Sequence, residues 1–515
     1  MQLHWIHIAG AALLLLLEIL TILHILFTMR DDSERASLWL ILVILLPFFG
    51  MGLYLVAGIS RLNTFGRRIS HSVDRFLRER AVAEHNSLRI YRESMLQFTK
   101  SAPEHPDTMD FTATLTGLQK RNSLYFSKES PAEANQANPV VPLGGAALTG
   151  NKIELFCDGT DAYPAMLDSI RSARKSINLQ SFIFADDSIG RKILSALQER
   201  AEAGVEVNVL FDKFGSLKSS WFLLRCRSRK LPKLKIKPFS HASLFTPWRI
   251  QLRNHRKLLV VDGITAFTGG LNISQENIRT ENHLGIHDFH CRVHGPVVGE
   301  LQYAFLCDWL YASKSPPDHL FLREYFPLPE RQGNDTVRLI ASGHGYFFEG
   351  TENVFFTAAS TAKKSIWIIT PYFVPTHDFS KALRMASARG VDVRLVVPSI
   401  NNHWYVKLAS ASFYEPLLAD GVRIFERREV FSHAKAMLVD EQWAYLGSSN
   451  CDVRSFRLNF ELDLLVESGD FPAVLKKQFL TELRKSEEII LRQFQKRNPG
   501  RKLAEGVCAL ISPVL

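Results

Sequence analysis

The sequence of 515 residues predicts an α/β fold built from two similar halves. Two observations carry this prediction. Residues 161–210 alternate helical patterns with apolar runs typical of strands, which indicates α/β layers. Residues 352–397 repeat the same order of blocks, so that Gly204 in one half corresponds to Gly390 in the other. A chain of this length can hold two or three domains, each with its own core.

Residues 1–60 are predicted to form a transmembrane helix hairpin. Residues 5–27 and 38–59 are almost wholly apolar, and each run is long enough to span a bilayer. The first run lacks a preceding basic stretch and an evident cleavage site, so a retained anchor is favoured over a signal peptide. Six arginines between residues 61 and 80 outnumber the two at residues 30–35. By the positive-inside rule, the end of the hairpin and everything after it are then cytoplasmic.

The remaining elements follow in order. Residues 61–150 are expected to be a charged juxtamembrane helix and a linker rich in Pro, Asn and Ala. The first domain is expected at 151–335, with strands at 177–184 and 205–210, and the second at 336–515, with strands at 366–369 and 391–396.

A spaced set of residues occurs once in each half. His255, Lys257, Asp262 and Asn272 are repeated with the same spacing as His433, Lys435, Asp440 and Asn450. One His-x-Lys-x4-Asp match arises by chance in roughly a few per cent of chains this long. A lone histidine on a strand is usually a core residue, but two extended matches at one spacing indicate a duplicated catalytic half-site.

The spacing places the histidine and lysine of each half on one face of a predicted strand, since strand side chains alternate. Such a pair suits a phosphate: lysine supplies positive charge, and histidine can attack phosphorus or exchange a proton. Asn272, Asn450 and Ser448 could add neutral donors. Asp262 and Asp440 complete the set of candidate catalytic residues, although their change of face favours holding the following turn. Two facing half-sites supply both a nucleophile and a general acid.

These motifs resemble those of the phospholipase D superfamily, and their surroundings resemble bacterial cardiolipin synthases. The segments that carry the resemblance are Arg253-Asn254-His255-Arg256-Lys257, Thr370-Pro371-Tyr372-Phe373-Val374-Pro375, Asp452-Val453-Arg454-Ser455-Phe456, Asn459-Phe460-Glu461 and the terminal Ser512-Pro513-Val514-Leu515. The resemblance implies two pseudo-symmetric α/β/α sandwich domains with the active site between them. It also implies that two phosphatidylglycerols are joined into cardiolipin with release of glycerol, through a phosphatidyl-histidine intermediate.

The resemblance further implies that a carboxylate holds each histidine. Asp288 follows the first motif and Glu461 the second, so we expect Glu461 to serve its own half, beside His433. Family analogy assigns the nucleophilic attack to His255 and acid–base duty to His433, where Glu461 would raise the imidazole pKa. His287 before Asp288 departs from the usual aromatic residue, which weakens the expectation for Asp288.

A basic run favours an anionic surface. The chain has no Asp or Glu from Lys213 to Val261 and carries a formal net charge of +10. The run consists of Arg225, Arg227, Arg229, Lys230, Lys233, Lys235 and Lys237. Contact with anionic lipid is the favoured interpretation, and a solvated edge strand at 233–237 is the alternative. The six cysteines show no metal-ligand spacing, so neither metal nor other cofactor is expected.

The sequence therefore predicts a multi-pass phosphatidyltransferase of the bacterial inner membrane. Its expected partners are phospholipid substrates, phosphatidylglycerol above all, and the lipid bilayer; no nucleic acid is expected, and the oligomeric state stays open. A membrane-tethered phospholipase D or nuclease would use the same motifs. A non-catalytic binding protein is the other class of alternative, but both histidines and both lysines are intact.

Overall fold

The computed structural model describes residues 2–29, 33–55, 94–95, 97–99, 146–226, 231–239, 252–281, 284–313, 325–343 and 350–510. The predicted juxtamembrane helix and linker lie almost wholly outside these residues, as do the six arginines of residues 61–80 used to predict the orientation. The chain divides into two compact units, one of residues 1–65 with 242–251 and one of residues 66–241 with 252–515.

The described residues of the N-terminal unit form three helices. They are α1 (Gln2–Thr28), α2 (Ser33–Leu45) and α3 (Pro47–Leu53). Ile25, Val43, Met51 and Tyr54 form their small core, and the Tyr54 hydroxyl lies 2.7 Å from His24 Nδ1. Pro47 separates α2 from α3 because proline has no N–H to continue a helix. Within the described part of the chain, we find no helix with both the length and the apolar character needed to cross a membrane. The predicted hairpin is thus not confirmed.

The first half of the second unit contributes seven strands to a large sheet. They are β1 (Ala147–Phe156), β2 (Ser176–Ser181), β3 (Glu206–Phe211), β4 (Leu234–Pro238), β5 (Leu258–Val261), β6 (Thr265–Gly269) and β7 (His290–His294). Its helices are α8 (Gly159–Ser172), α9 (Ser188–Glu202), α10 (Ser220–Arg225), the short 3-10 helix η3 (Gln275–Asn277) and α11 (Val297–Ser313).

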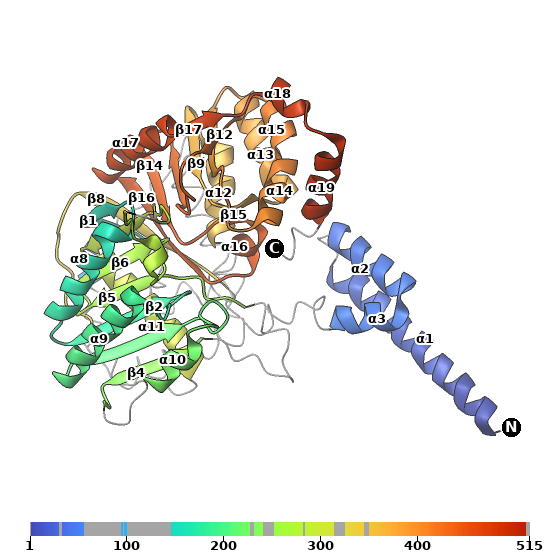
Figure 1. Ribbon diagram of the computed structural model, residues 1–515, viewed down its shortest axis with the longest axis horizontal. Helices are drawn as coiled ribbons and strands as arrows, with labels where there is room; N and C mark the ends of the chain where they lie inside the picture. The colour runs from blue at the N-terminus through green and yellow to red at the C-terminus, as the bar shows by residue number, and fades with distance from the viewer. Residues whose placement is uncertain are drawn as a thin grey trace, which may run out of the picture. The chain divides into compact units, whose positions relative to one another are not determined.

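The second half repeats this order (Figure 1). Its strands are β8 (Asp335–Ser342), β9 (Ser365–Ile369), β10 (Phe373–Val374), β11 (Asp392–Pro398), β12 (Arg423–Arg427), β13 (Ala436–Val439), β14 (Trp443–Gly447), β15 (Cys451–Asp452), β16 (Glu461–Ser468) and β17 (Ser486–Glu488). Its helices are α12 (Gly350–Thr361), α13 (His377–Ala388), α14 (Trp404–Ser412), α15 (Tyr414–Ala419), α16 (Val453–Arg457), α17 (Phe471–Arg484), α18 (Leu491–Gln495) and α19 (Pro499–Leu510).

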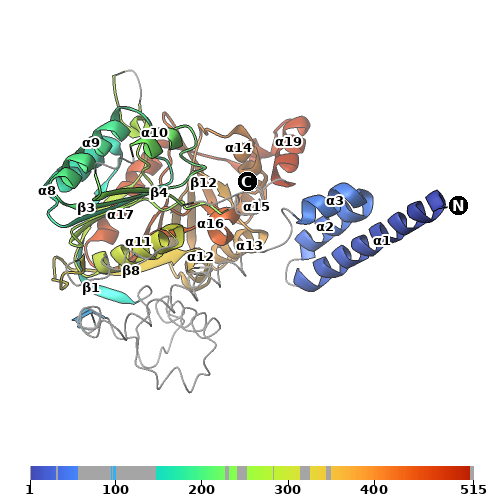
Figure 2. The same ribbon diagram turned by 90° about the horizontal axis from the view of Figure 1, so that it is seen from below.

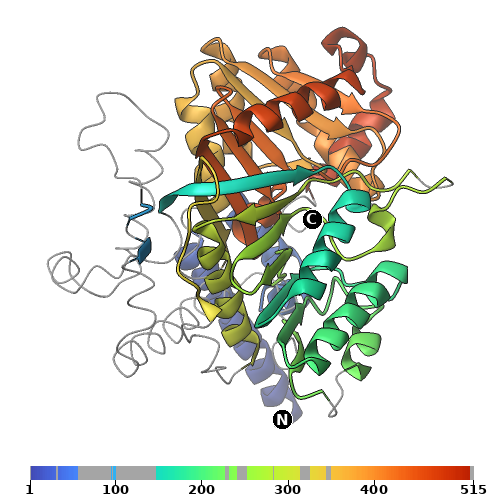
Figure 3. The ribbon, with the colours of Figure 1, turned by 90° about the vertical axis from the view of Figure 1, so that its left-hand side faces the viewer.

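Both halves share one continuous sheet. Its strand order is β17-β12-β11-β9-β13-β14-β16-β8-β1-β7-β6-β5-β2-β3-β4. Reading outward from the antiparallel pair of β1 and β8, each half runs through equivalent strands, so β5 corresponds to β13 and β3 to β11. Figure 3 shows β1 crossing between the two halves. The predicted sandwiches are therefore two layered halves of one sheet.

Strand alternation assigns each face of the sheet to a helix layer. In β2, Ile177 and Leu179 belong to the core that α8 and α9 cover. The alternate residue Asn178 donates to Gln302 of α11 on the other face. Figure 2 shows α8 and α9 on one side of the sheet and α11 on the other. In the second half, α12 and α13 share one core with the strands, and α17 packs on the opposite face.

Candidate active site

The first candidate histidine lies just before a strand, where the two halves meet. Asn254 forms a parallel bridge with Phe460 of the other half, and the His255 N–H donates to the Phe460 carbonyl at 2.9 Å. Strand β5 begins only at Leu258. The prediction that the strand includes His255 and Lys257 is therefore wrong, because this stretch pairs with the second half instead of its neighbours in the sheet.

The second histidine has the same environment with the halves exchanged. His287 bridges to Ser432, and the His433 N–H donates to the His287 carbonyl at 2.7 Å. Strand β13 begins at Ala436, directly after Lys435. Each motif is thus held by backbone hydrogen bonds to the segment that precedes the carboxylate of the opposite half.

This crossing exchanges the expected carboxylate partners. His255 Nδ1 lies 3.0 Å from Glu461, and His433 Nδ1 lies 2.6 Å from Asp288. The expectation that Glu461 serves His433 is wrong, since each histidine takes its carboxylate from the other half. A carboxylate only accepts, so Nδ1 of each ring carries the hydrogen and Nε2 is left for chemistry.

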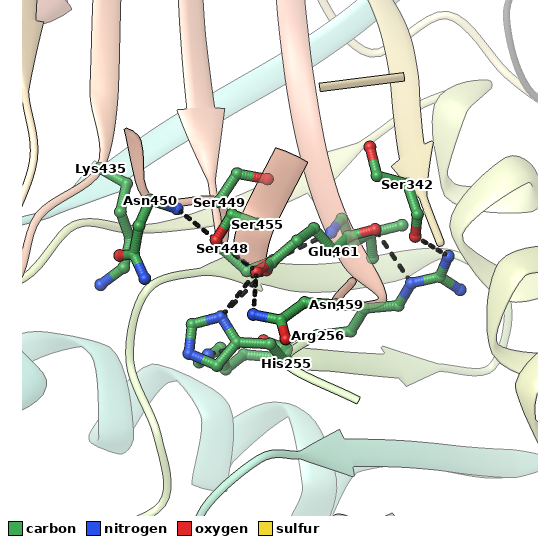
Figure 4. Close-up of polar contacts among 12 residues, drawn as sticks. His255, Arg256, Ser342, Lys435, Ser448, Ser449, Asn450, Ser455, Asn459 and Glu461 are labelled. Carbon is green, nitrogen blue, oxygen red and sulfur yellow. Dashed lines mark hydrogen bonds and ion pairs between the residues drawn. The ribbon is translucent and has the colours of Figure 1, made fainter. Parts of the chain in front are cut away.

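Glu461 is fully buried and accepts hydrogen bonds from several side chains (Figure 4). Besides His255, its donors are Ser448 at 2.6 Å, Ser455 at 2.8 Å and Asn459 at 3.1 Å. Burial raises the pKa of Glu461, although Lys257 opposes the shift. The carboxylate is thereby fixed in orientation, and its charge is shared among neutral donors.

Asp288 is equally buried but relies on a cation. Burial opposes its ionisation, yet Lys435 and His433 hold the pKa of Asp288 below its ordinary value. Lys435 Nζ lies 3.5 Å from the Asp288 carboxylate. Gly270 makes room for this acid, because a Cβ there would lie 2.0 Å from Asp288 Oδ1. In the equivalent position of the second motif, Ser448 instead donates to Glu461.

The two lysines are almost inaccessible, each 1% exposed. Lys257 Nζ donates to the His255 carbonyl at 2.6 Å, and Lys435 makes the same contact with the His433 carbonyl. Each ammonium therefore turns back to its own histidine. Burial lowers the pKa of Lys257 to about 7 and that of Lys435 to about 8.

Both imidazoles are neutral near pH 7 in the absence of substrate. Burial, together with Lys257 and Lys435, holds the pKa of His255 well below its usual value. Burial and Lys435 lower the pKa of His433 to about 4. The expected upward shift of His433 is therefore wrong in direction as well as in partner. Because the lysine of each half acts on the histidine of the other, the two half-sites lie within one electrostatic environment.

The two motif aspartates hold turns. Asp262 accepts three backbone N–H groups from Arg174, Lys175 and Ser176. Asp440 accepts the equivalent N–H groups of Lys363, Lys364 and Ser365. Both aspartates have a left-handed φ of 53°. Their carboxylates are thus used at the far end of β5 and β13, away from the histidines, which agrees with the turn-holding interpretation of their change of face.

Of the predicted neutral donors, Asn272 and Ser448 are held by structural partners through their side chains. Asn272 accepts the Ile183 N–H at 3.1 Å through its side chain. Ser448 is engaged with Glu461, as described. The Asn450 N–H donates to Ser455, whereas its side-chain oxygen is buried without a hydrogen-bond partner among the described residues. Asn450 is the candidate whose side chain keeps capacity for a ligand.

One buried ion pair, which occurs in the first half only, was not predicted from the sequence. Arg256, which corresponds to Ala434, is 2% exposed and donates two hydrogen bonds of 2.9 Å to Asp308 of α11. It also donates to the carbonyls of Glu461 and Ser342, both in the second half. Asp308 lies 52 residues from Arg256, and no local pattern relates the two. Arg256 therefore fastens the halves together next to His255.

The basic run is only partly described, because residues 227–230 lie outside the described residues. Strand β4 is the last strand of the sheet on its side. Lys233 and Lys235 lie 3.0 and 3.5 Å from Glu206 of the neighbouring strand. These two lysines fit the edge-strand alternative.

Comparisons with known proteins place this arrangement in a family. The family described as "Cardiolipin synthase, PLD-like domain" matches residues 166–305 and 356–483, one stretch in each half. The chain belongs to this family. The family described as "Phospholipase_D-nuclease N-terminal" matches residues 16–58. The chain is thus a member of the cardiolipin synthases of the phospholipase D superfamily.

Individual relatives agree with the family over most of the chain. A cardiolipin synthase of Listeria monocytogenes is 30% identical over 97% of this chain and 99% of its own length. One from Clostridium perfringens is 32% identical over 71% of this chain and 77% of its own. The crystal structure of a phosphatidylserine synthase from Haemophilus influenzae superposes with a TM-score of 0.54 at 15% identity, covering 70% of this chain and 95% of that one. This last likeness concerns the fold alone.

Proposed function

We propose that the protein is a phosphatidyltransferase that joins two phosphatidylglycerols into cardiolipin and releases glycerol. The observation that carries the proposal is the crossed pair of half-sites, in which two histidines, each with Nδ1 against a carboxylate of the other half, share one site with two buried lysines. Phosphodiester exchange requires a nucleophile, a proton carrier and positive charge for the phosphate oxygens. The family supplies the lipid class.

In the first step, His255 Nε2 attacks the phosphorus of one phosphatidylglycerol. His433, which is neutral in the free enzyme, takes up a proton at Nε2 when the anionic phosphate binds beside it. The bond from phosphorus to the glycerol oxygen then breaks, and His433 gives this proton to the departing glycerol. The product is a phosphatidyl group on His255. Lys257 and Lys435 stabilise the negative charge that gathers on the non-bridging oxygens.

In the second step, the hydroxyl of another phosphatidylglycerol attacks this intermediate. His433, now neutral, takes the hydroxyl proton, and the bond from phosphorus to His255 breaks. The enzyme returns to its starting state with cardiolipin formed. No water is consumed in either step, which distinguishes this transfer from hydrolysis.

The environments of the two carboxylates support this division of labour. Asp288 has its pKa held low by Lys435, and it forms the shorter contact with its histidine, at 2.6 Å. An ionised partner stabilises an imidazolium, which suits His433 to carry the proton. Glu461 shares its charge among three neutral donors, so it stabilises an imidazolium less and leaves His255 neutral for attack.

Membrane association fits both the lipid substrate and the N-terminal family match. We propose that the N-terminal helices attach the enzyme to the bacterial inner membrane. The catalytic halves are proposed to face the cytoplasm, on the strength of the arginine imbalance between residues 30–35 and 61–80.

Product analysis tests the function. Full-length protein in detergent is incubated with phosphatidylglycerol, and separately with a DNA duplex. We expect cardiolipin and glycerol in equal amounts and intact DNA. Phosphatidic acid as the main lipid product would instead indicate a hydrolase, and cleaved DNA a nuclease. A lack of any product would favour a binding protein.

A further inference from the structure

The chain after β3 exposes apolar side chains at a helical spacing. They occur at intervals of three, four and three residues, which is the repeat of one helix face. These side chains, called the apolar platform here, belong to Phe214, Leu217, Trp221 and Leu224, whose exposed fractions are 51%, 65%, 69% and 38%.

The opposite side of the same segment buries serines. Ser216 and Ser219 are 1% and 4% exposed. The Ser216 hydroxyl donates to the Phe182 carbonyl and accepts the Phe184 N–H, both at 3.0 Å, and the Ser219 hydroxyl donates to the Phe184 carbonyl. Leu223 of the same segment is fully buried in the core. The serine hydroxyls add polar attachments on this inward side, while the four apolar side chains of the platform lie outward.

Positive charge surrounds the apolar platform. Lys213, Lys218 and Arg225 are exposed beside it, and no acidic residue occurs between Lys213 and Val261. The Arg225 guanidinium lies 4.2 Å from the centre of the Trp221 ring. Apolar and aromatic side chains among cations match the boundary of an anionic bilayer, where the acyl chains take up the former and the phosphates attract the latter. This charge complementarity favours lipid over an apolar protein surface.

The apolar platform is joined directly to the candidate nucleophile. Asp212 accepts the N–H groups of Phe214 and Gly215 with one oxygen and the N–H of Asn254, the residue before His255, with the other. The Arg253 guanidinium stacks 3.5 Å over the Phe214 ring. Through these contacts, the placement of the apolar platform determines the placement of His255.

The second half offers a smaller counterpart. Strand β11 is equivalent to β3, and the residues after it expose Ile400 by 53% and Trp404 by 70%. Tyr372 connects this segment to the other half-site, because its ring centre lies 6.0 Å from that of His403 and 6.1 Å from that of His433.

We infer that the apolar platform rests in the interfacial layer of an anionic phospholipid bilayer and holds His255 at the level of the lipid phosphates. Substrate then reaches the histidine from the membrane without crossing water. The inference rests on the proposed function for the identity of that substrate, whereas the contact with the bilayer has its own evidence.

Tryptophan quenching tests the contact. Full-length wild-type, Trp221→Phe and Trp443→Phe proteins are reconstituted in vesicles of phosphatidylglycerol and acyl-brominated phosphatidylcholine, whose bromines quench only tryptophans in the bilayer. Trp443 begins β14, at the other end of that strand from the catalytic motif. We expect Trp221→Phe to remove part of the quenched fluorescence and Trp443→Phe to remove none. The Trp221 contribution should fall severalfold when neutral lipid replaces phosphatidylglycerol.

A kinetic pair gives a second readout. Leu217→Glu should raise the apparent KM for vesicle-borne phosphatidylglycerol about tenfold, because it places a negative charge against an anionic surface. Met385→Glu, at a 55% exposed position of α13, is the matched control and should leave the KM unchanged. Equal quenching of wild-type and Trp221→Phe protein, or equal KM values for the two glutamate variants, would overturn the inference. Absence of cardiolipin from the wild-type vesicles would refute the proposed function instead, while the quenching result still decides the contact.

Discussion

Replacing Glu461 with glutamine is expected to disable His255 and to leave His433 unaffected. Glu461 accepts hydrogen bonds from four side chains with two oxygens. Glutamine has the same shape but offers one acceptor oxygen and an NH2 group. About two of the four donors then lose their acceptor, at about 1.5–3 kcal/mol for each hydrogen bond to a charged group.

The imidazole is the partner that can adapt. By reversing its tautomer, His255 would accept a hydrogen bond from the new NH2 group, but its Nε2 would then carry hydrogen and could not attack. Two lost bonds cost the folded protein about 3–6 kcal/mol of stability. The loss of rate follows from the tautomer: a wrong tautomer in a Ser-His-Asp triad lowers kcat by about 10⁴, so we expect a rate loss of at least about 10³-fold.

The assay combines the initial rate of cardiolipin formation with ¹⁵N NMR of histidine-labelled protein, in which the tautomer is read from the imidazole nitrogens. Glu461→Gln should shift the His255 resonances, and Asp288→Asn, the matched control, those of His433. Variants lacking each histidine assign the signals. A Glu461→Gln protein that perturbs His433 instead, or that retains a rate within threefold of wild type, would refute the crossed pairing.

Three further outcomes follow from the same geometry. Lys257→Ala and Lys435→Ala should each lower the rate of cardiolipin formation at least about a hundredfold, since a lost contact to transition-state charge costs about 3 kcal/mol; near-normal rates with an unchanged circular dichroism spectrum would make the lysine structural. Burial lowers the pKa of Lys257 to about 7 and that of Lys435 to about 8. Because each lysine is charged only below its pKa, kcat/KM should fall as the pH rises through that range. A flat profile from pH 6 to 9 would contradict this. Arg256→Met should lower the free energy of unfolding by about 3–5 kcal/mol, because it leaves Asp308 buried without its ion-pair partner. The control Arg428→Met breaks an exposed pair with Glu487 and should cost under about 1 kcal/mol. Equal losses in denaturant unfolding would show that the Arg256 pair is not needed to join the halves.

The sequence predicts the local elements and the repeat well. Alternating helix and strand patterns locate β2, β3, β9 and β11 to within a few residues, because each is an apolar run bounded by a turn or a helix. The spacing within each motif also correctly relates Asp262 and Asp440 to the turns after their strands. These features depend on neighbours in sequence, which periodicity reports.

Long-range partners follow no such pattern. The exchange of Asp288 and Glu461 depends on how β1 and β8 join the halves into one sheet, and nothing near either residue in the sequence expresses that pairing. Arg256 and Asp308 meet for the same reason. The contact of Asn459 with Glu461 is easier to expect from the sequence. The two residues lie two positions apart, and in an extended segment such residues have their side chains on the same face. The histidine pKa values depend on burial within the assembled site, which reverses the upward shift expected from a carboxylate alone.

The covalent intermediate is the most direct test of the account. His433→Ala and His255→Ala proteins are incubated with radiolabelled phosphatidylglycerol, quenched in acid and digested, and the labelled peptide is identified. Because removal of the nucleophile abolishes the covalent species while removal of the proton carrier only slows it, His433→Ala protein should carry label on His255, and His255→Ala protein should carry none. Label on His433 in the His255→Ala protein would contradict the assignment of the nucleophile.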